Sequence, residues 1–278
     1  MYLLIIFCLF LICPILQGNG FRLKSYNLNK YTSSEHHLDC LHTVRKVPLP
    51  KEFTFCYRHK QLYNGGSWGR KGGSILLANY NHDWTVVKTG IELAYWTNPW
   101  IAIHHNGSMA WIKPGEGYGF NMLTWRHTCL AISLLDFSYM MYENGELVKD
   151  AQFDEKFRKG LSQTAVDIIT VGCAHMPQQF KESHPGIVTD FQLFGTKLSE
   201  QKMKDWTGCT ERMQGDIVSW DMEEWFFNKT GNGSEIEYLE FEKDVCNMQE
   251  LSHHIFPTKE RFSKSMDQCR KVSAKMNV

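Results

Sequence analysis

Two cysteine-bearing segments constrain the fold of this chain more than any other feature. Residues 53–58 read Phe-Thr-Phe-Cys-Tyr-Arg, and residues 125–132 read Trp-Arg-His-Thr-Cys-Leu-Ala-Ile. Bulky apolar residues alternate with polar or small ones in both segments, which is the period-2 pattern of a half-buried strand. In a secreted chain, two mid-strand cysteines far apart in sequence suggest two strands that lie side by side and are locked by a disulfide.

The N-terminal residues predict entry into the secretory pathway. Residues 1–20 form an apolar core that ends in small residues, as a signal peptide does, and we expect cleavage after Gly18 or Gly20. An uncleaved anchor is the alternative, because no Lys or Arg precedes the apolar core. No second apolar run long enough to cross a bilayer follows. We therefore expect an extracellular, secreted protein.

The charge and the cysteine content limit the kinds of binding partner that we expect. Lys plus Arg number 30 and Asp plus Glu number 30, so no nucleic-acid partner is expected. Of the nine cysteines, Cys8 and Cys13 belong to the signal peptide, which leaves seven. An odd number outside the cell indicates a free thiol, a disulfide-linked partner or homo-oligomer, or a pairing residue beyond this chain. The remaining cysteines are Cys40, Cys56, Cys129, Cys173, Cys209, Cys246 and Cys269.

Three Asn-x-Ser/Thr triplets agree with a secretory route. They predict N-glycosylation at Asn106, Asn228 and Asn232.

Short apolar runs separated by turn residues predict an all-β fold. We expect residues 21–37 to be a loose N-terminal arm, and the runs then follow at close intervals with almost no helix. Asn144-Gly145 between two apolar segments is a strong hairpin signal. One helix is predicted over residues 199–206, with Ser199 as its N-cap and Leu198 and Met203 as a hydrophobic staple. The pattern favours a two-sheet antiparallel jelly-roll sandwich with one short C-terminal helix. The predicted strands occupy residues 41–47, 53–58, 74–80, 85–88, 91–96, 100–104, 110–112, 125–132, 168–172, 186–194 and 215–221.

The order of these features resembles a pentraxin domain of the concanavalin A-like lectin/glucanase superfamily over residues 38–225. The resemblance implies a jelly roll and a Cys56–Cys129 disulfide between adjacent strands. It is carried by the two cysteine segments, the hairpin at Asn144-Gly145, residues 169–172 and 186–194, Leu198-Ser199 and Trp220.

The chain departs from this family where the family binds calcium. Calcium-binding members carry a Gln-Glu-Asp-type cluster just after the strand that matches residues 169–172, whereas residues 173–180 contain no carboxylate. Calcium takes six to eight oxygen ligands, several of them charged. We therefore expect no bound cofactor, with Asn81, Asp83, Gln178 and Gln179 as remnants of a calcium site.

The C-terminal part differs in character from the jelly-roll segment. Residues 226–245 are acidic and carry two of the glycosylation triplets, which predicts a linker. In residues 246–278, Phe262, Met266 and Cys269 share a helical face. This stub resembles the opening of a C-type lectin-like module, and Cys269 is our candidate for the unpaired thiol.

No catalytic or metal constellation can be assembled by spacing. The pairs His36-His37, His104-His105 and His253-His254 do not predict a metal site, because neighbouring residues point apart on a strand or helix. His127 lies on the strand face of Cys129, and we interpret it as a structural hydrogen-bonding residue.

Two further groups of residues are candidates for a functional role, namely a pair of carboxylates and three tryptophans. Asp221 and Glu223 can share a strand face, but a solvated pair is the expectation, so the sequence predicts no enzyme. Trp68, Trp96 and Trp100 are candidate ligand contacts that could stack on sugar rings, with core packing as the alternative.

Two functions follow as hypotheses. The first is an extracellular, non-enzymatic module that recognises a glycan, a lipid headgroup or a protein without the family's calcium. The second is a structural or assembly segment, the N-terminal ectodomain of a larger receptor or channel.

Overall fold

A computed structural model describes ten stretches of the chain. They are residues 23–27, 41–43, 45–61, 72–82, 86–95, 99–114, 125–172, 186–223, 225–227 and 237–241. The sequence expectations for the signal peptide, for residues 246–278 and for most cysteines lie outside these residues.

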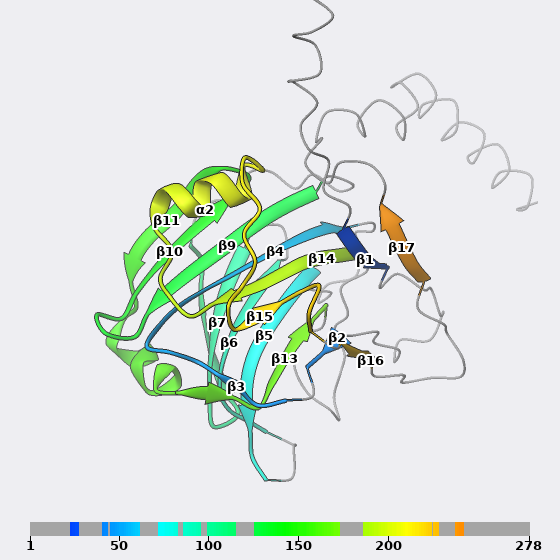
Figure 1. Cartoon of the computed structure of the whole chain (residues 1–278). Helices are drawn as coiled ribbons and strands as arrows, with labels where there is room; N and C mark the ends of the chain where they lie inside the picture. The colour runs from blue at the N-terminus through cyan, green and yellow to red at the C-terminus, as the bar shows by residue number, and fades with distance from the viewer. Residues whose placement is uncertain are drawn as a thin grey trace, which may run out of the picture.

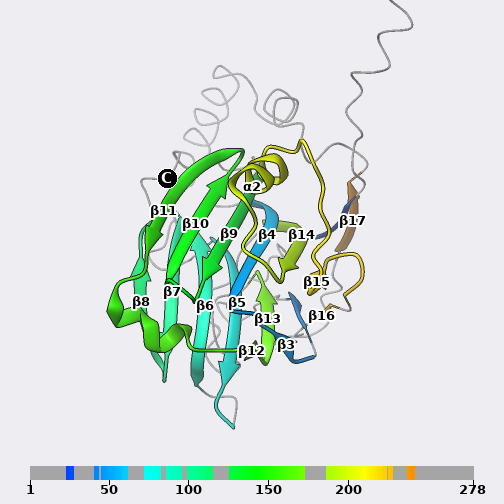
Figure 2. The same ribbon diagram turned by 60° about the vertical axis from the view of Figure 1, so that its left-hand side comes forward.

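Two antiparallel sheets lie face to face, which confirms the predicted sandwich (Figures 1 and 2). The first sheet has the order β11-β10-β9-β4-β14-β1-β17, with β15 paired to β14. Its strands are β11 (Glu146–Gln152), β10 (Ser138–Glu143), β9 (Trp125–Ser133), β4 (Glu52–Gln61), β14 (Gly186–Phe194), β1 (Leu23–Asn27), β17 (Glu237–Phe241) and β15 (Val218–Ser219).

The second sheet has the order β16-β2-β13-β5-β6-β7-β8. Its strands are β16 (Phe226–Phe227), β2 (Leu41–His42), β13 (Ile168–Val171), β5 (Gly72–Tyr80), β6 (Val87–Tyr95), β7 (Pro99–His105) and β8 (Ser108–Ile112). A short pair, β12 (Ala165–Val166) and β3 (Val47–Pro48), lies beside it. The two helical segments are the 3-10 helix η2 (Glu155–Leu161) and the α-helix α2 (Glu200–Thr207).

The two cysteine segments pair as the sequence predicts. Strands β4 and β9 are in register from Glu52 opposite Ser133 to Lys60 opposite Trp125. Cys56 lies directly opposite Cys129, their Cα atoms are 4.1 Å apart, and a disulfide joins them. The predicted bridge is confirmed.

The core lies between the sheets and follows from strand alternation. Phe53 and Phe55 on β4 face Leu77 on β5 and Ile91 on β6, and all four side chains are fully buried. The Cys56–Cys129 bridge lies on the other face of the first sheet. Helix α2 packs there against β9 and β10 (Figure 1).

Helix α2 begins and packs as predicted. The Ser199 side chain accepts a hydrogen bond from the Lys202 N–H, at 3.4 Å. Leu198 and Met203 are both buried with the disulfide, as a hydrophobic staple requires. The helix therefore covers the outer apolar patch of the first sheet.

A buried ion pair ties α2 to the sheet beneath it. The Arg58 Nε donates to Asp190 Oδ2 at 2.9 Å, and both side chains are fully buried. The Arg58 guanidinium lies 4.0 Å from the ring centroid of Trp206, and its Nη1 lies 2.9 Å from the Sγ of Cys209. Cys209 is disulfide-bonded to a cysteine outside the described residues.

His127 belongs to the same buried region. Its Nδ1 lies 3.1 Å from the Thr207 carbonyl oxygen and 3.3 Å from the Cys209 Sγ. These contacts confirm its interpretation as a structural residue.

The first sheet extends into segments that the sequence assigns to an arm and a linker. Strand β1, within the predicted arm 21–37, pairs with both β14 and β17, and β17 lies within the predicted linker 226–245. The edge of β14 offers unpaired N–H and C=O groups, so a segment without hydrophobic period can join it through the backbone alone. Backbone pairing of this kind cannot be predicted from the pattern of apolar side chains.

We predict that removing the disulfide weakens the fold. The Cys56→Ala/Cys129→Ala variant should lose about 2–4 kcal/mol of unfolding free energy, because the bridge joins residues separated by 73 positions and restricts the unfolded chain. Denaturant titration of the variant and the wild-type chain measures this difference. Equal midpoints and slopes would contradict it.

We also predict a loss of stability in alkali from two buried tyrosines. Burial raises the pKa of Tyr57 and of Tyr95 well above 10. Because the folded pKa exceeds the unfolded value, the stabilisation is complete below pH 10 and falls as pH rises, by about 1.4 kcal/mol per tyrosine per pH unit. Unfolding titrations above pH 10 should show a shallower decline for Tyr57→Phe/Tyr95→Phe, and an unchanged slope would contradict the assignment.

Candidate functional site

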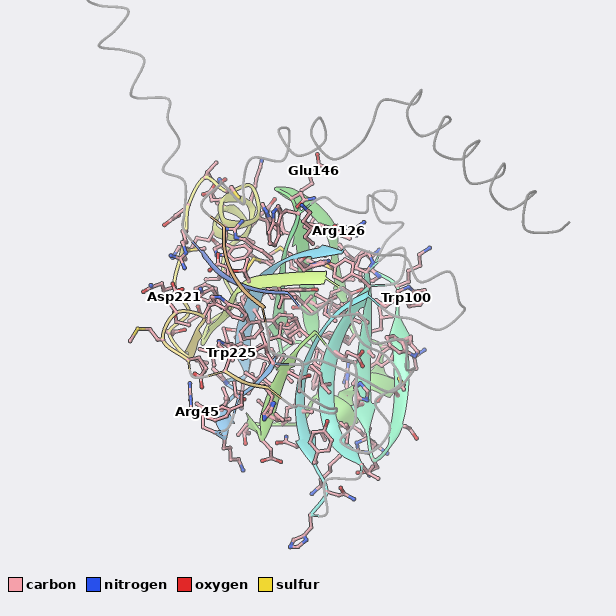
Figure 3. The ribbon with its side chains drawn as sticks, turned by 90° about the vertical axis from the view of Figure 1, so that its right-hand side faces the viewer. Arg45, Trp100, Arg126, Glu146, Asp221 and Trp225 are labelled. Carbon is pink, nitrogen blue, oxygen red and sulfur yellow. A yellow bond between two sulfur atoms is a disulfide. The ribbon has the colours of Figure 1, made fainter. Side chains whose placement is uncertain are left out.

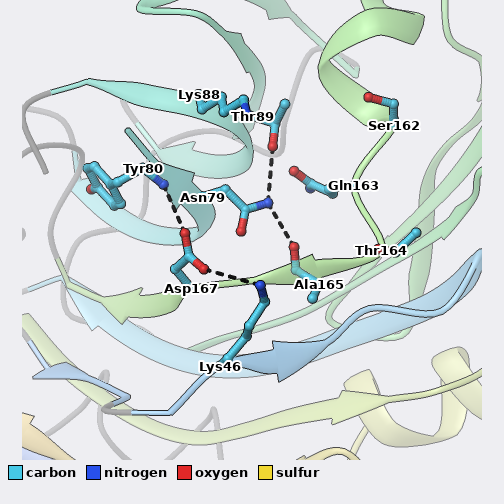
Figure 4. A pocket seen from close by; sticks show the side chains of 10 residues that line it. All are labelled: Lys46, Asn79, Tyr80, Lys88, Thr89, Ser162, Gln163, Thr164, Ala165 and Asp167. Carbon is cyan, nitrogen blue, oxygen red and sulfur yellow. Dashed lines mark hydrogen bonds and ion pairs between the residues drawn. The ribbon is translucent and has the colours of Figure 1, made fainter. Parts of the chain in front are cut away.

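A polar pocket opens at the rim of the sandwich, where β5 and β6 run past the apolar core (Figure 4). Its volume is about 350 Å³. Asn79 lies opposite Thr89, two pairs beyond Leu77 and Ile91 in the β5–β6 register. Period-2 alternation therefore places Asn79 and Thr89 on the face that lines the core, as its polar continuation.

The opposite wall is the segment that links η2 to β12. Phe157 and Leu161 of η2 are buried in the core. Gly160 permits the close approach, because a Cβ there would lie 2.5 Å from the Ile103 Cγ2 and 2.8 Å from the His104 carbonyl oxygen. The Leu49 N–H donates to the Thr164 carbonyl oxygen at 2.8 Å. Both ends of the segment are thus fixed.

Two polar side chains join the walls of the pocket. The Asn79 Nδ2 donates to the Ala165 carbonyl oxygen at 2.7 Å and to the Thr89 Oγ1 at 3.1 Å. Asp167 accepts from the Tyr80 N–H at 3.3 Å through Oδ2 (Figure 4). These bonds hold the pocket in shape and leave other lining groups for a ligand.

Gln163 is the exceptional lining residue. Its side chain is only 6% exposed, yet neither Nε2 nor Oε1 has a hydrogen-bond partner (Figure 4). Buried polar side chains in folded proteins are overwhelmingly hydrogen-bonded, and leaving a group unsatisfied costs about 1–3 kcal/mol. Gln163 also lines the pocket, so a molecule that reached this buried amide could both donate to it and accept from it.

The charges around the pocket favour an electron-rich ligand. Lys46 and Lys88 contribute two positive charges and Asp167 one negative charge, which leaves one positive charge in excess. Lys46 Nζ lies 3.8 Å from Asp167 Oδ1, and the two side chains are 69% and 31% exposed. An exposed pair at this distance is weak, so Lys46 remains available to a ligand.

A second pocket of about 440 Å³ adjoins the first across Tyr80 and Lys88. It lies at the ends of two hairpins, where Asn81 closes the β5–β6 turn and Asn106-Gly107 forms the β7–β8 turn with φ of 48° and 77°. Asn106, a predicted glycosylation site, lines it. The two pockets share Tyr80 and Lys88 and lie next to each other along this rim.

The calcium remnants are not brought together among the described residues. The Asn81 Oδ1 accepts from the Val86 N–H at 2.9 Å, so this oxygen already serves the turn. Asp83, Gln178 and Gln179 lie outside the described residues. The part of the chain that the structure describes contains no group of three or more His, Cys, Asp or Glu arranged to hold a metal ion.

Trp100, the one predicted tryptophan contact within the described residues, lines neither pocket. Trp100 lies half-buried on β7, with its ring 6.4 Å from that of Trp111 in an edge-on arrangement (Figure 3). Trp68 and Trp96 lie outside the described residues, as do Asn228 and Asn232.

The other candidate chemical groups have structural partners. His104 Nε2 lies 2.9 Å from Glu92 Oε2, and both side chains are buried. Asp221 pairs with Arg212, whereas Glu223 pairs with Arg45 at 2.8 Å (Figure 3). The two carboxylates therefore serve different ion pairs.

Sequence reasoning missed Gln163, Asn79, Lys88 and Thr89. They come from three separate elements, and each resembles an ordinary polar residue at a strand end or in a connection. Their shared pocket distinguishes them, and Gln163 is in addition buried.

Solved structures share this two-sheet jelly-roll architecture. The chain resembles the native heptameric SAP-like pentraxin from Limulus polyphemus with a TM-score of 0.60 and 16% identity, over 81% of this chain and 97% of that one. It also resembles the full extracellular region of zebrafish Gpr126/Adgrg6, with a TM-score of 0.51 and 10% identity, over 76% of this chain and 27% of that one. At these identities the likeness shows the fold alone.

The sequence comparisons give no match. No model of a known protein family matches the chain, and no curated protein does.

We predict that Gln163 opposes stability, unlike an ordinary buried glutamine. Gln163→Met should leave the unfolding free energy unchanged or raise it by about 1 kcal/mol, because it removes an unsatisfied buried amide. The matched control is Gln192→Met, since the Gln192 amide donates to Asp190 at 2.8 Å and accepts from the Gly215 N–H at 2.8 Å. That variant should lose about 1–3 kcal/mol in denaturant titrations. Equal losses for the two variants would show that Gln163 is merely structural.

Proposed function

We propose that this chain is an extracellular, non-enzymatic recognition module of the pentraxin type, which binds a hydroxyl-rich ligand in the pocket around Gln163. The observation that carries the proposal is the buried, unpartnered Gln163 amide in a polar pocket with fixed walls. A glycan is the ligand class that best matches such a site, because its hydroxyls both donate and accept hydrogen bonds.

The chemistry of the pocket supports binding rather than catalysis. Among the lining residues that the structure describes, only Asp167 carries a carboxylate, and glycoside hydrolysis generally uses a pair of carboxyl groups. That carboxylate already accepts from the Tyr80 N–H and faces Lys46. The described lining residues of this first pocket include no histidine or cysteine that could act as a base or nucleophile.

The disulfides support the extracellular assignment. Cys56, Cys129 and Cys209 are disulfide-bonded, and disulfides persist chiefly in oxidising compartments. None of the helices in the described part of the chain has the length and hydropathy of a membrane span. We keep the predicted signal peptide (1–20) and C-type lectin-like stub (246–278) as proposals. We extend the recognition domain beyond 38–225, because β1 of the predicted arm (21–37) and β17 of the predicted linker (226–245) pair in its first sheet.

We propose that this recognition does not require calcium. The pocket offers side-chain amides, hydroxyls and lysines that can contact a sugar directly. Asn81, the one calcium remnant within the described residues, uses its side-chain oxygen to close a turn.

A glycan array probed with the secreted chain tests the proposal. We expect capture of a subset of glycans in the presence and in the absence of EDTA. Gln163→Met should weaken capture by about 10–100-fold, because two hydrogen bonds to the ligand are lost. Gln192→Met and the stability measurement above show whether a loss of binding merely reflects unfolding.

Two results would overturn the proposal. Capture that is unchanged in Gln163→Met would place the ligand elsewhere, and capture abolished by EDTA would restore a calcium site. An array without capture, together with disulfide-linked oligomers on non-reducing gels, would favour the assembly function.

A further inference from the structure

We infer that the pocket around Gln163 selects an anionic sugar, one that presents a vicinal diol to Gln163 and a carboxylate or sulfate to Lys88. This inference rests on the proposed function and specifies its ligand.

We infer the diol of the ligand from the unpaired side-chain amide of Gln163. Gln163 presents one acceptor, Oε1, and two N–H donors on Nε2, and none of them has a partner in the part of the chain that the structure describes. Two adjacent hydroxyls of a sugar ring match this arrangement, because one can donate to Oε1 while the other accepts from Nε2. A ligand with acceptors alone, such as free sulfate, would leave Oε1 unsatisfied. The amide therefore favours a polyol over a simple anion.

We infer the anionic group of the ligand from Lys46 and Lys88, the two lysines that line the pocket. Lys88 lines both pockets and has no ion-pair partner within the described part of the chain. Lys46 shares only the loose contact with Asp167. Asp167 is oriented by the Tyr80 N–H, so its charge is partly compensated at one oxygen. An anion bound near Lys88 would therefore contact the ammonium group of Lys88, and the ammonium group of Lys46 lines the same pocket.

The arrangement of the two pockets fits a sugar within a longer glycan. The first pocket, at about 350 Å³, lies at the lower end of the range for small-molecule sites. The adjoining pocket of about 440 Å³ begins at Tyr80 and Lys88 and gives room for the next unit. Lys88 stands at the boundary, where a charged substituent linking or flanking two sugars would lie.

Predicted glycosylation of Asn106, which lines the second pocket, requires a control. Asn106 lines the second pocket and is a predicted glycosylation site, so the protein's own glycan could compete for the same surface. The Ser108→Ala substitution removes the triplet and retains Asn106, and Ser108 lines neither pocket. Every arm of the test therefore uses the full secreted chain with Ser108→Ala.

The test compares three probes that share one neutral core: N-acetyllactosamine, its sialylated derivative and its sulfated derivative. Binding is measured by calorimetry at low and high salt. We expect at least one anionic derivative to bind about tenfold more tightly than the neutral core, with an advantage that shrinks at high salt. Preference for the sialylated probe identifies a carboxylate, and preference for the sulfated probe identifies a sulfate.

Two variants test the roles of the residues. Lys88→Gln should lower the affinity for the preferred anionic probe about tenfold, because one charge-assisted contact is lost. Lys149→Gln, an equal charge change at an exposed position on β11, should have no effect. Gln163→Glu keeps the length of the side chain but adds a negative charge, and it should weaken anionic probes more than the neutral one.

The outcomes separate this inference from the proposed function. Equal affinity for all three probes, unaffected by Lys88→Gln but lost in Gln163→Met, would overturn the anionic preference and leave the recognition module intact. Absence of binding to any glycan, on this panel and on the array, would overturn both. Calorimetric binding that Lys88→Gln and Lys149→Gln weaken equally would show a non-specific charge effect and would also overturn the inference.

Discussion

The structure depends on the pairing of β4 with β9, which stays in register across the middle of the first sheet. This register turns Phe53 and Phe55 toward the second sheet and places Cys56 and Cys129 on the opposite face. A slip of one residue would exchange the two faces, so the disulfide and the core specify the same register. On the outer face, α2 packs against the disulfide. Arg58 of β4 contacts both Trp206 of that helix and Asp190 of β14.

The candidate site exists because the strands of the second sheet run beyond this core. The inward positions of β5 and β6 change from Leu77 and Ile91 to Asn79 and Thr89 within one step of the alternation. The buried end of η2 then brings Gln163 against these polar positions. A pocket formed in this way has rigid walls and a buried amide, which are the properties that allow a few hydrogen bonds to discriminate among ligands.

The sequence predicts the scaffold better than the site. Alternation around Cys56 and Cys129, the Asn144-Gly145 turn and the Ser199 cap are local signals, and the structure confirms each of them. Strand β1 joins the sheet through backbone pairing, which side-chain patterns do not record. Gln163 lies in a connection without periodicity, and its burial results from contacts with residues far away in sequence. The tryptophans chosen for their chemistry lie away from the pocket or outside the described residues.

The central claim is that the Gln163 amide pairs with a ligand, and the most direct measurement is the NMR spectrum of the side-chain amides during titration with the sialylated or sulfated probe. Gln163→Met identifies the Gln163 resonances, and those of Gln192, whose amide is already bonded on both sides, serve as the internal reference. We predict that both Nε2–H resonances of Gln163 shift and exchange more slowly with water as the probe is added, while those of Gln192 stay in place. Gln163 resonances that remain unchanged at saturating probe would contradict the account.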